Sequence, residues 1–409
     1  MSAFPHIIVA RSNPIAPDPR VEKATAALAE AGYHVTIIGW DRSAALPPRE
    51  IISGIDCIRL PIQAQFGHGL GNFAPLLRWQ WGLLRWLMQN RRGYNIIHAC
   101  DFDTVLPALV VKLLFGKRVV YDIFDFYTDH LRATPGWVKS LIRSVDLWAI
   151  RRVDALIITD ESRWVQVGER LPQNRAVVLN TPRDYDYNTL TRTSQTQMKF
   201  LKLRRRKERQ EEQKRKTWRS SPIRGDFSAK KTLNLVYVGL LQTERGLLNV
   251  LNVLGDHPEW HLDLAGFGGD ENQILALSDE LPNVTWHGRI PYERALALTA
   301  AADVVLALYD PAIPNHRYAS PNKLFEAMML GKPVIVAADT NIDRIVQAEN
   351  CGLVVEYGHR PELVKALECL QLDKVLYAEF AANARRAYEQ DYDWSTVSAR
   401  LLRLYQQLR

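Results

Sequence analysis

The sequence has few cysteines, and they follow no metal-binding or disulfide pattern. None of the four cysteines lies in a CxxC pair, which argues against a zinc or disulfide framework and fits a reducing compartment. The N-terminus has a short apolar run without a basic region or cleavage site, so we expect no signal peptide. No charge-free apolar stretch reaches the length of about 18 residues that spans a bilayer. We therefore expect a cytoplasmic protein without a membrane-spanning helix.

The positive charge of the chain comes from one region that has few acidic residues. Residues 199–219 contain 11 Lys and Arg against 3 Glu, a local net charge of +8, and the rest of the chain has a net charge of −1. The basic character is therefore local and is not a property of the fold. The run lies within residues 184–230, which we interpret as an exposed helix or disordered tether inserted between two domains.

Both halves of the chain alternate strands and helices, which is typical of parallel sheets covered on both faces. We therefore predict an α/β fold of two doubly wound, Rossmann-like domains, 1–183 and 231–385, that face each other across a cleft at the carboxyl ends of their strands. We expect residues 386–409 to form a helix that packs back on the first domain. The predicted strands are 6–11, 34–40, 57–62, 95–101, 118–124, 154–160, 176–182, 233–240, 260–267, 283–289, 303–310, 333–339 and 352–357.

An apolar helix with a single glutamate stands out at NHRYASPNKLFEAMMLGKPVIV (315–336). Ser320 is a good capping residue, and Gly331 ends the helix before a buried strand. A lone carboxylate such as Glu326 is costly to bury without partners. Asn322 and Lys323 occupy the helix start, where free amides and the helix dipole favour an anion. The pattern therefore predicts a ligand with both an anionic group and hydroxyls.

A second candidate anion site is GLLQTERG (239–246), which follows a strand, opens a helix and carries Arg245. Taken alone, Arg245 is more simply interpreted as a surface arginine. Taken alone, Glu326 is more simply interpreted as a carboxylate whose hydrogen bonds are satisfied by neighbouring groups. Together they fit a nucleotide sugar, whose diphosphate lies on the helix start while its ribose diol reaches the carboxylate. Glycine-rich stretches at 67–71 and 266–270 lack GxGxxG spacing, so an NAD site is poorly supported.

These motifs resemble those of the GT-B glycosyltransferases, specifically the large retaining group called family 4 or group 1. IAPDPRVEKATAALAEAGYHVTIIG resembles the first β-loop-α-β unit, NIIHACDFDTVLPAL the acceptor-side strand and helix, and YVGLLQTERG the diphosphate loop. ASPNKLFEAMMLGKPVIV, the most specific match, resembles the donor-sugar and ribose motif. The resemblance covers nearly the whole chain outside the basic insert.

The resemblance implies transfer of a sugar from a nucleotide-diphosphate donor with retention at the anomeric carbon. Glu326 would bind the ribose hydroxyls, and Arg245 and Lys323 would bind the diphosphate and stabilise it as it leaves. Since no DxD-like motif stands out, we expect no metal, and we expect no cofactor beyond the donor itself. The other implied donor-binding residues are Gly239, Arg317, Tyr318, Ser320, Asn322 and Leu324.

Acceptor-side roles are implied for two segments of the first domain. Asp18 and Arg20 fall on the loop after the first strand, which in the family approaches the donor phosphates or the acceptor. Asp101 ends the acceptor-side strand. Many members have a histidine where this chain has Cys100, and His98 shares that face because alternate strand residues point the same way. Which of these groups meets the substrate stays open, and His98 is equally well interpreted as a satisfied core histidine.

The donor motifs also depart from the family pattern. A second glutamate that often contacts the donor sugar is replaced by Tyr318, so other groups must recognise the sugar. Candidates are His316, Arg317 and Ser320. The arginine that often follows the loop glycine in the family is replaced here by Leu240. Arg245 must therefore supply more of the binding to the diphosphate. Two alternatives therefore stay open: a nucleotide-sugar epimerase or hydrolase on this fold, and a non-catalytic scaffold with a decayed transferase site.

Residues 73–93 combine an apolar stripe with a basic face. The stripe is Leu77, Trp81, Leu84 and Met88, and the basic face is Arg78, Arg85 and Arg92 beside Trp79 and Trp86. The pattern fits an interfacial helix or a core helix with solvated arginines. Together with 199–219 it favours docking on an anionic membrane, where each basic residue adds about 1 kcal/mol. We therefore expect a saccharide acceptor, lipid-linked or a glycolipid precursor, at the cytoplasmic membrane face, and no nucleic-acid partner.

Overall fold

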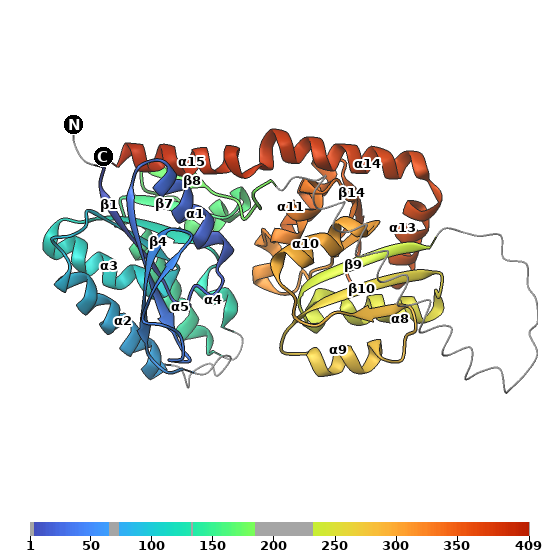
Figure 1. Cartoon of the computed structure of the whole chain (residues 1–409), viewed down its shortest axis with the longest axis horizontal. Coiled ribbons are helices and arrows are strands. Elements are labelled where there is room, and N and C mark those ends of the chain that lie inside the picture. Colours follow the sequence, from blue (N-terminus) through green and yellow to red (C-terminus); the bar gives the residue numbers. More distant parts are fainter. Residues whose placement is uncertain (1–3, 65–72, 132–133, 185–231, 409) are drawn as a thin grey trace, which may run out of the picture. The chain divides into compact units, whose positions relative to one another are not determined.

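The computed structural model describes residues 4–64, 73–131, 134–184 and 232–408. The chain forms two compact units. Unit 1 comprises Met1–Asn180 and Trp394–Arg409, and unit 2 comprises Thr181–Asp393 (Figure 1). The basic run at 199–219 and the glycine-rich stretch at 67–71 lie outside the described residues, so the predictions made for them stay predictions.

Unit 1 contains an eight-stranded sheet in the order β3-β4-β2-β1-β5-β6-β7-β8. Every pair of neighbouring strands is parallel except β3 and β4, which form an antiparallel hairpin at one edge. Strand β3 is not among the strands predicted from the sequence. The strands are β1 (His6–Arg11), β2 (His34–Asp41), β3 (Arg49–Ile52), β4 (Ile55–Pro61), β5 (Ile96–Cys100), β6 (Arg118–Ile123), β7 (Ala155–Ile158) and β8 (Asn174–Val177).

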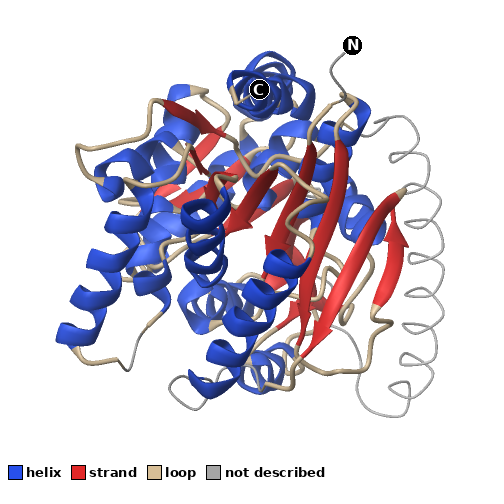
Figure 2. Ribbon diagram, turned by 90° about the vertical axis from the view of Figure 1, so that its left-hand side faces the viewer, coloured by secondary structure: helices blue, strands red, loops and turns tan. Residues whose placement is uncertain are grey.

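Helices cover both faces of this sheet (Figure 2). The C-terminal helix α15 (Trp394–Gln407) packs on α1 (Pro19–Glu30) and β8, and it buries Val397, Leu401 and Tyr405. The spacing of these residues is that of a single helical face, which explains why the end of the chain returns to unit 1. The other helices are α2 (Phe73–Gln89), α3 (Phe102–Phe115), α4 (Tyr127–His130), α5 (Gly136–Ile150), η2 (Glu161–Arg163) and α6 (Trp164–Val167).

Helix α2 has two different apolar faces. Three side chains are fully buried: Trp79, Leu83 and Leu87. The Trp79 ring stacks on the Trp40 ring, with the ring centroids 5.5 Å apart. The predicted placement of Trp79 on the arginine face is therefore wrong, because this side chain belongs to the core. Trp81, in contrast, is 67% exposed and belongs to the predicted outer stripe.

Unit 2 contains a six-stranded parallel sheet in the order β11-β10-β9-β12-β13-β14. The strands are β9 (Leu233–Leu240), β10 (Trp260–Phe267), β11 (Val284–Trp286), β12 (Val304–Ala307), β13 (Val334–Ala337) and β14 (Gly352–Val355). The helices are η3 (Thr243–Arg245), α8 (Leu247–Asp256), α9 (Glu271–Ser278), α10 (Tyr292–Ala301), η4 (Pro314–Tyr318), α11 (Asn322–Met329), α12 (Asn341–Ala348), α13 (Arg360–Leu372), α14 (Lys374–Ala387) and η5 (Tyr388–Tyr392).

In each unit the strand order reverses beside the first strand. From β1 the chain builds outward through β2 and β4, then returns to place β5 on the other side of β1. In unit 2 it builds through β10 and β11, then places β12 on the other side of β9. Open α/β sheets bind ligands at the carboxyl ends of the strands that flank such a reversal. Ligand sites are therefore expected at the carboxyl ends of β1 and β5 in unit 1 and of β9 and β12 in unit 2.

Candidate active site

Two glycines shape the carboxyl ends of β9 and β10. Gly239 pairs with Gly266, and both have positive φ, at 153° and 148°. A Cβ on Gly239 would lie 3.2 Å from Lys323 Nζ, and a Cβ on Gly266 would lie 1.8 Å from the Gly239 carbonyl oxygen. Only glycine fits this close approach, which brings the backbone of β9 against the lysine at the start of α11.

Two tyrosines that sequence reasoning missed hold the two predicted cations of this site. Lys323 Nζ lies 3.6 Å from the ring centroid of Tyr237, which is on β9. The Arg245 guanidinium lies 4.4 Å from the ring centroid of Tyr309, just after β12, and Lys323 Nζ lies 5.6 Å from the same ring. Both tyrosines are buried. The two rings lie at the strand reversal and form a tyrosine floor, meaning a surface on which both cations are held by cation–π attraction.

Within the described part of the chain, neither Arg245 nor Lys323 forms a salt bridge with a carboxylate. Burial and the nearby Arg245 lower the pKa of Lys323 well below its usual range, although Glu326 opposes this shift. Two like charges held together in this way provide a site for an anion that carries two charges, such as a diphosphate.

The start of α11 differs from the prediction. Pro321 occupies the N-cap in an extended conformation with ψ 139°, and no side chain caps the helix, so the prediction of a Ser320 cap is wrong. The Ser320 Oγ and Asn322 Oδ1 atoms are buried without a hydrogen-bond partner among the described residues. The Leu324 amide already donates to the Pro321 carbonyl. Ser320 and Asn322 are therefore the polar groups at this helix start with unused hydrogen-bonding capacity.

Glu326 lies one turn further along α11 and is partly buried. Its negative charge raises the pKa of Lys323 and contributes to raising that of Tyr309, so it acts on the same cluster. The structure therefore places Glu326 within electrostatic range of Lys323 and Tyr309. Its role toward a ribose stays a prediction.

The turn η4 contributes a neutral imidazole to the site. His316 is buried, lies edge-on to the Tyr309 ring and pairs through Nδ1 with the Asp310 carbonyl oxygen at 3.0 Å. Burial, followed by repulsion from Arg245, lowers the pKa of His316 to about 4. Arg317 is exposed and donates to the Pro311 carbonyl oxygen, and Tyr318 is partly exposed beside it.

The lowered pKa of Lys323 makes donor binding depend on pH. A bound diphosphate favours the charged amine, so above the pKa of the free site binding takes up a proton. The affinity for a nucleotide sugar should then fall by up to about tenfold per pH unit. Titration calorimetry with UDP- and GDP-sugars in buffers of different ionisation enthalpy measures this uptake. Binding that takes up no proton at any pH between neutrality and the usual lysine pKa of 10.5 would contradict the assignment.

In unit 1, the strand reversal carries an ion-pair cluster centred on Arg11. Arg11 Nε donates to Asp18 at 3.1 Å, and Arg11 Nη1 pairs with Asp101. Asp18 also accepts from the Val21 amide and caps α1. Asp101 has φ 65°, and its second oxygen accepts from the Phe124 amide at 2.8 Å. Both oxygens of Asp101 are thus committed to protein groups, and burial raises its pKa to about 6 although Arg11 opposes the shift.

A neighbouring carboxylate that sequence reasoning missed has an unused oxygen. Asp103, in the first turn of α3, is 6% exposed, and its Oδ1 has no hydrogen-bond partner among the described residues. Its charge raises the pKa of Arg42, which follows β2, although burial of Arg42 outweighs this and lowers that pKa. Of these two carboxylates, Asp103 is therefore the one that keeps an oxygen without a protein partner among the described residues.

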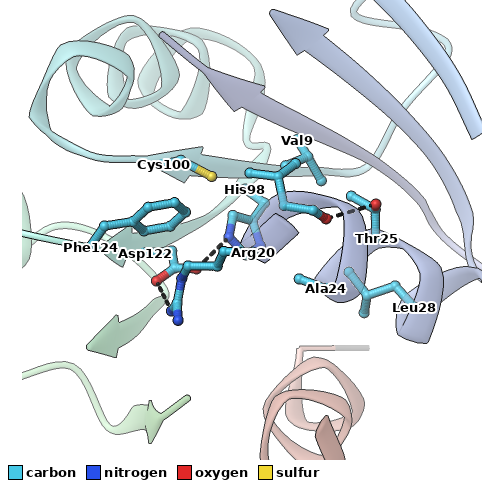
Figure 3. Close-up of a pocket in the computed structure, with 10 residues that line it drawn as sticks. Val9, Arg20, Ala24, Thr25, Leu28, His98, Cys100, Asp122 and Phe124 are labelled. Carbon is cyan, nitrogen blue, oxygen red and sulfur yellow. Dashed lines mark hydrogen bonds and ion pairs between the residues drawn. The ribbon is translucent and has the colours of Figure 1, made fainter. Parts of the chain in front are cut away.

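His98 belongs to a buried polar network (Figure 3). Its Nε2 lies 3.2 Å from Asp122 and its Nδ1 lies 2.6 Å from the Tyr405 hydroxyl on α15. Arg20 donates to Asp122 at 2.8 Å and to the Val178 carbonyl oxygen. The pocket that these side chains line leaves no room for a water molecule. The structure thus gives His98 and Arg20 partners inside unit 1, and their predicted substrate contacts stay predictions.

Tyr405→Phe should destabilise the protein through this network. The substitution keeps the ring but leaves His98 Nδ1 without its partner, and an unsatisfied buried polar group costs about 1–3 kcal/mol. Urea unfolding measures the loss. Tyr318→Phe is a suitable control, because the Tyr318 hydroxyl makes no hydrogen bond within the described residues. Equal stability of the two variants would contradict the assignment.

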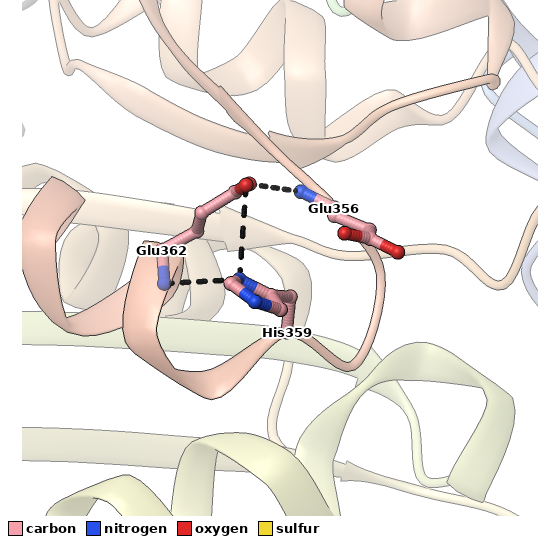
Figure 4. Close-up of side chains that lie close together, drawn as sticks. All are labelled: Glu356, His359 and Glu362. Carbon is pink, nitrogen blue, oxygen red and sulfur yellow. Dashed lines mark hydrogen bonds and ion pairs between the residues drawn. The ribbon is translucent and has the colours of Figure 1, made fainter.

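Three exposed side chains near the start of α13 lie within reach of one another: Glu356, His359 and Glu362 (Figure 4). Glu362 accepts from the Glu356 amide at 2.7 Å, and His359 accepts from the Glu362 amide at 3.4 Å. These bonds describe a helix cap. We assign no metal to the group because its members are exposed and already serve the cap.

Two family models match the chain. The model for "Glycosyl transferases group 1" matches residues 223–387, and that for "Glycosyl transferase 4-like domain" matches residues 17–179. The chain belongs to the group 1 glycosyl transferases, and its fold is GT-B. The first of these matches lies within unit 2 and includes Arg245, Lys323 and the two tyrosines.

Relatives with solved structures share the fold at low sequence identity. Sucrose-phosphate synthase from Thermosynechococcus elongatus has a TM-score of 0.75 at 18% identity over 99% of both chains. Anabaena Alr3699/HepE in complex with UDP has a TM-score of 0.66 at 16% identity over 99% of this chain and 100% of that one. A phosphatidyl-myo-inositol mannosyltransferase from Mycobacterium leprae is 28% identical over 139 residues, 34% of this chain and 36% of that protein. That match therefore spans about a third of the mannosyltransferase.

Proposed function

We propose that the protein transfers a sugar from a nucleotide-diphosphate sugar to a hydroxyl group of an acceptor. The observation that carries the proposal is the pair Arg245 and Lys323. These cations lie over two tyrosine rings at the strand reversal of unit 2 and form no salt bridge with any described residue. A site of this kind suits a diphosphate, and solved relatives were obtained with UDP and with UDP-glucose. Glu326, on the same helix as Lys323, is the proposed ligand of the ribose hydroxyls.

The reaction we propose proceeds with retention and needs neither metal nor cofactor. Charge develops on the diphosphate as the bond to the sugar breaks, and the two cations stabilise that charge without reorganising. Hydrogen-bond donors that act in this way are worth about 10²–10³ in rate each. Ser320 and Asn322 supply the unused polar atoms beside them.

The acceptor we propose is a lipid-linked saccharide or a glycolipid precursor at the cytoplasmic face of the membrane. The basic run at 199–219 and the outer stripe of α2 support this choice, since both suit an anionic lipid surface. None of the helices in the described residues is long and apolar enough to cross a bilayer.

Slow transfer to water tests the reaction without knowledge of the acceptor. The protein is incubated with UDP-, GDP- and ADP-sugars, and the released nucleoside diphosphate and the first sugar anomer are followed by NMR. We expect release from one nucleotide series, an anomer of the donor's configuration, unchanged rates in EDTA, and loss of release in Arg245→Met. An inverted first anomer or a requirement for metal would contradict the proposed mechanism.

A further inference from the structure

We propose that the outer faces of α2, α3 and α5 form one surface of unit 1 that docks on an anionic lipid bilayer. This surface is called the docking face below. The inference rests on the lipid-side acceptor proposed above and assigns the part of the chain that reaches it. The sequence pattern predicted lipid contact for the helix within residues 73–93, and the proposal adds α3 and α5.

The three helices form one layer on one face of the sheet. They connect β4 to β5, β5 to β6 and β6 to β7, and right-handed crossovers in the same direction place such helices on the same side. Contacts join α2 to α3 and α3 to α5, and Figure 1 shows α2 and α3 side by side. Side chains that point away from the sheet on these helices therefore share one outer surface.

Large apolar side chains lie on that outer surface of each helix. On α2, Leu77 and Trp81 are 50% and 67% exposed, while the opposite side of the helix is buried in the core. On α3, Leu113 is 85% exposed. On α5, Trp137 and Trp148 are 73% and 44% exposed. Large exposed apolar patches mark interaction sites, and tryptophan is enriched at the membrane–water interface.

The exposed charged side chains on the three helices themselves are basic, and the Lys112 side chain on α3 pairs with Asp154, which follows α5. The three helices carry two acidic residues, Asp103 and Asp146, which are 6% and 1% exposed and therefore do not contribute to the surface. Arg78 and Arg85 on α2 are exposed, and Arg152 just after α5 stacks on the Trp148 ring at 4.3 Å. An interfacial surface needs apolar side chains that enter the headgroup region and basic side chains that pair with lipid phosphates. The tryptophans and leucines of the docking face supply the first, and its arginines supply the second.

The charge decides which bilayer is bound. Each basic side chain near an anionic leaflet is worth about fivefold in partitioning, and salt screens this attraction. Burying an exposed tryptophan is worth about tenfold or more. We therefore expect the full chain to sediment with vesicles of phosphatidylcholine and phosphatidylglycerol at low salt, and much less with phosphatidylcholine alone.

Two variants and their matched controls test the docking face. Trp81→Ser with Trp137→Ser should reduce sedimentation by about tenfold or more, and Arg78→Glu with Arg85→Glu should remove the preference for phosphatidylglycerol. The controls come from unit 2, where Leu372 and Val375 are 62% and 81% exposed. Leu372→Ser with Val375→Ser should sediment as the wild type does.

A third variant separates the docking face from the basic run. Deletion of residues 199–219 should weaken sedimentation and leave the effect of the tryptophan substitutions in place. Loss of all sedimentation on this deletion, with none on the tryptophan substitutions, would overturn the proposal. So would a wild-type chain that stays in solution with every vesicle, which would point to a protein partner instead. Nucleotide-induced thermal shifts, measured on each variant, show that it is folded and test the donor site independently of docking.

Discussion

Replacing Lys323 with methionine is expected to weaken binding of the nucleoside diphosphate that the wild type binds by about 10- to 150-fold, because a hydrogen bond to a charged group contributes about 1.5–3 kcal/mol. Methionine keeps the length of the side chain and its packing on Tyr237. Titration calorimetry with the free nucleotides measures the loss directly. An unchanged affinity would remove the lysine from the diphosphate site.

The same substitution is expected to raise the melting temperature of the protein without nucleotide. Burial lowers the pKa of Lys323 below its usual value of 10.5, so the unfolded chain binds more protons than the folded one in the window between the two values. The resulting penalty is complete below the folded pKa and disappears as pH approaches 10.5. The stabilisation by methionine should therefore shrink from neutral to alkaline pH. A variant that is less stable than the wild type at neutral pH would contradict this account.

Gly266→Ala is expected to disrupt the donor side of unit 2. The added Cβ would lie 1.8 Å from the Gly239 carbonyl oxygen, and the backbone φ of 148° strains any residue other than glycine. Overpacking and strain together should cost roughly 3 kcal/mol or more. For a domain of this size this lowers the melting temperature by roughly 6 °C or more.

Gly269→Ala is the matched control for that substitution. Gly269 lies three residues along the same turn, and nothing lies within 4 Å of the position that its Cβ would take. It should change the stability by roughly 0.5 kcal/mol or less. Calorimetric melting of the two variants in parallel separates the close approach of β9 and β10 from a general intolerance of alanine in this turn. Similar melting temperatures would contradict the role given to Gly266.

The fold could be predicted from the sequence because its signals are local. β12, β13 and β14 are short apolar runs rich in valine, and Gly331 ends α11 where the sequence indicated. The edge strand β3 was missed because three of its four residues are exposed, so it lacks the apolar pattern of the buried strands. Ser320 was wrongly given a capping role because Pro321 takes the N-cap position itself.

The sequence predicted the residues of the candidate site only where they lie close together in a single motif. Lys323 and Glu326 lie on one helix, so their spacing already suggested a shared ligand. Tyr237, Tyr309 and Asp103 were missed because their importance comes from neighbours on other strands and helices, which no local spacing reveals. For the same reason the sequence left His98 open, since its partner Tyr405 lies more than 300 residues away.

The central claim is that unit 2 holds a nucleotide-sugar site with Glu326 on the ribose. Thermal shifts of the wild type and of Glu326→Ala with UDP-, GDP- and ADP-sugars test it most directly. A donor at 100 times its dissociation constant should stabilise the wild type by about 2.7 kcal/mol. The account predicts that one nucleotide series does so and that the variant responds much less. No shift with any series, or equal shifts in both proteins, would contradict it.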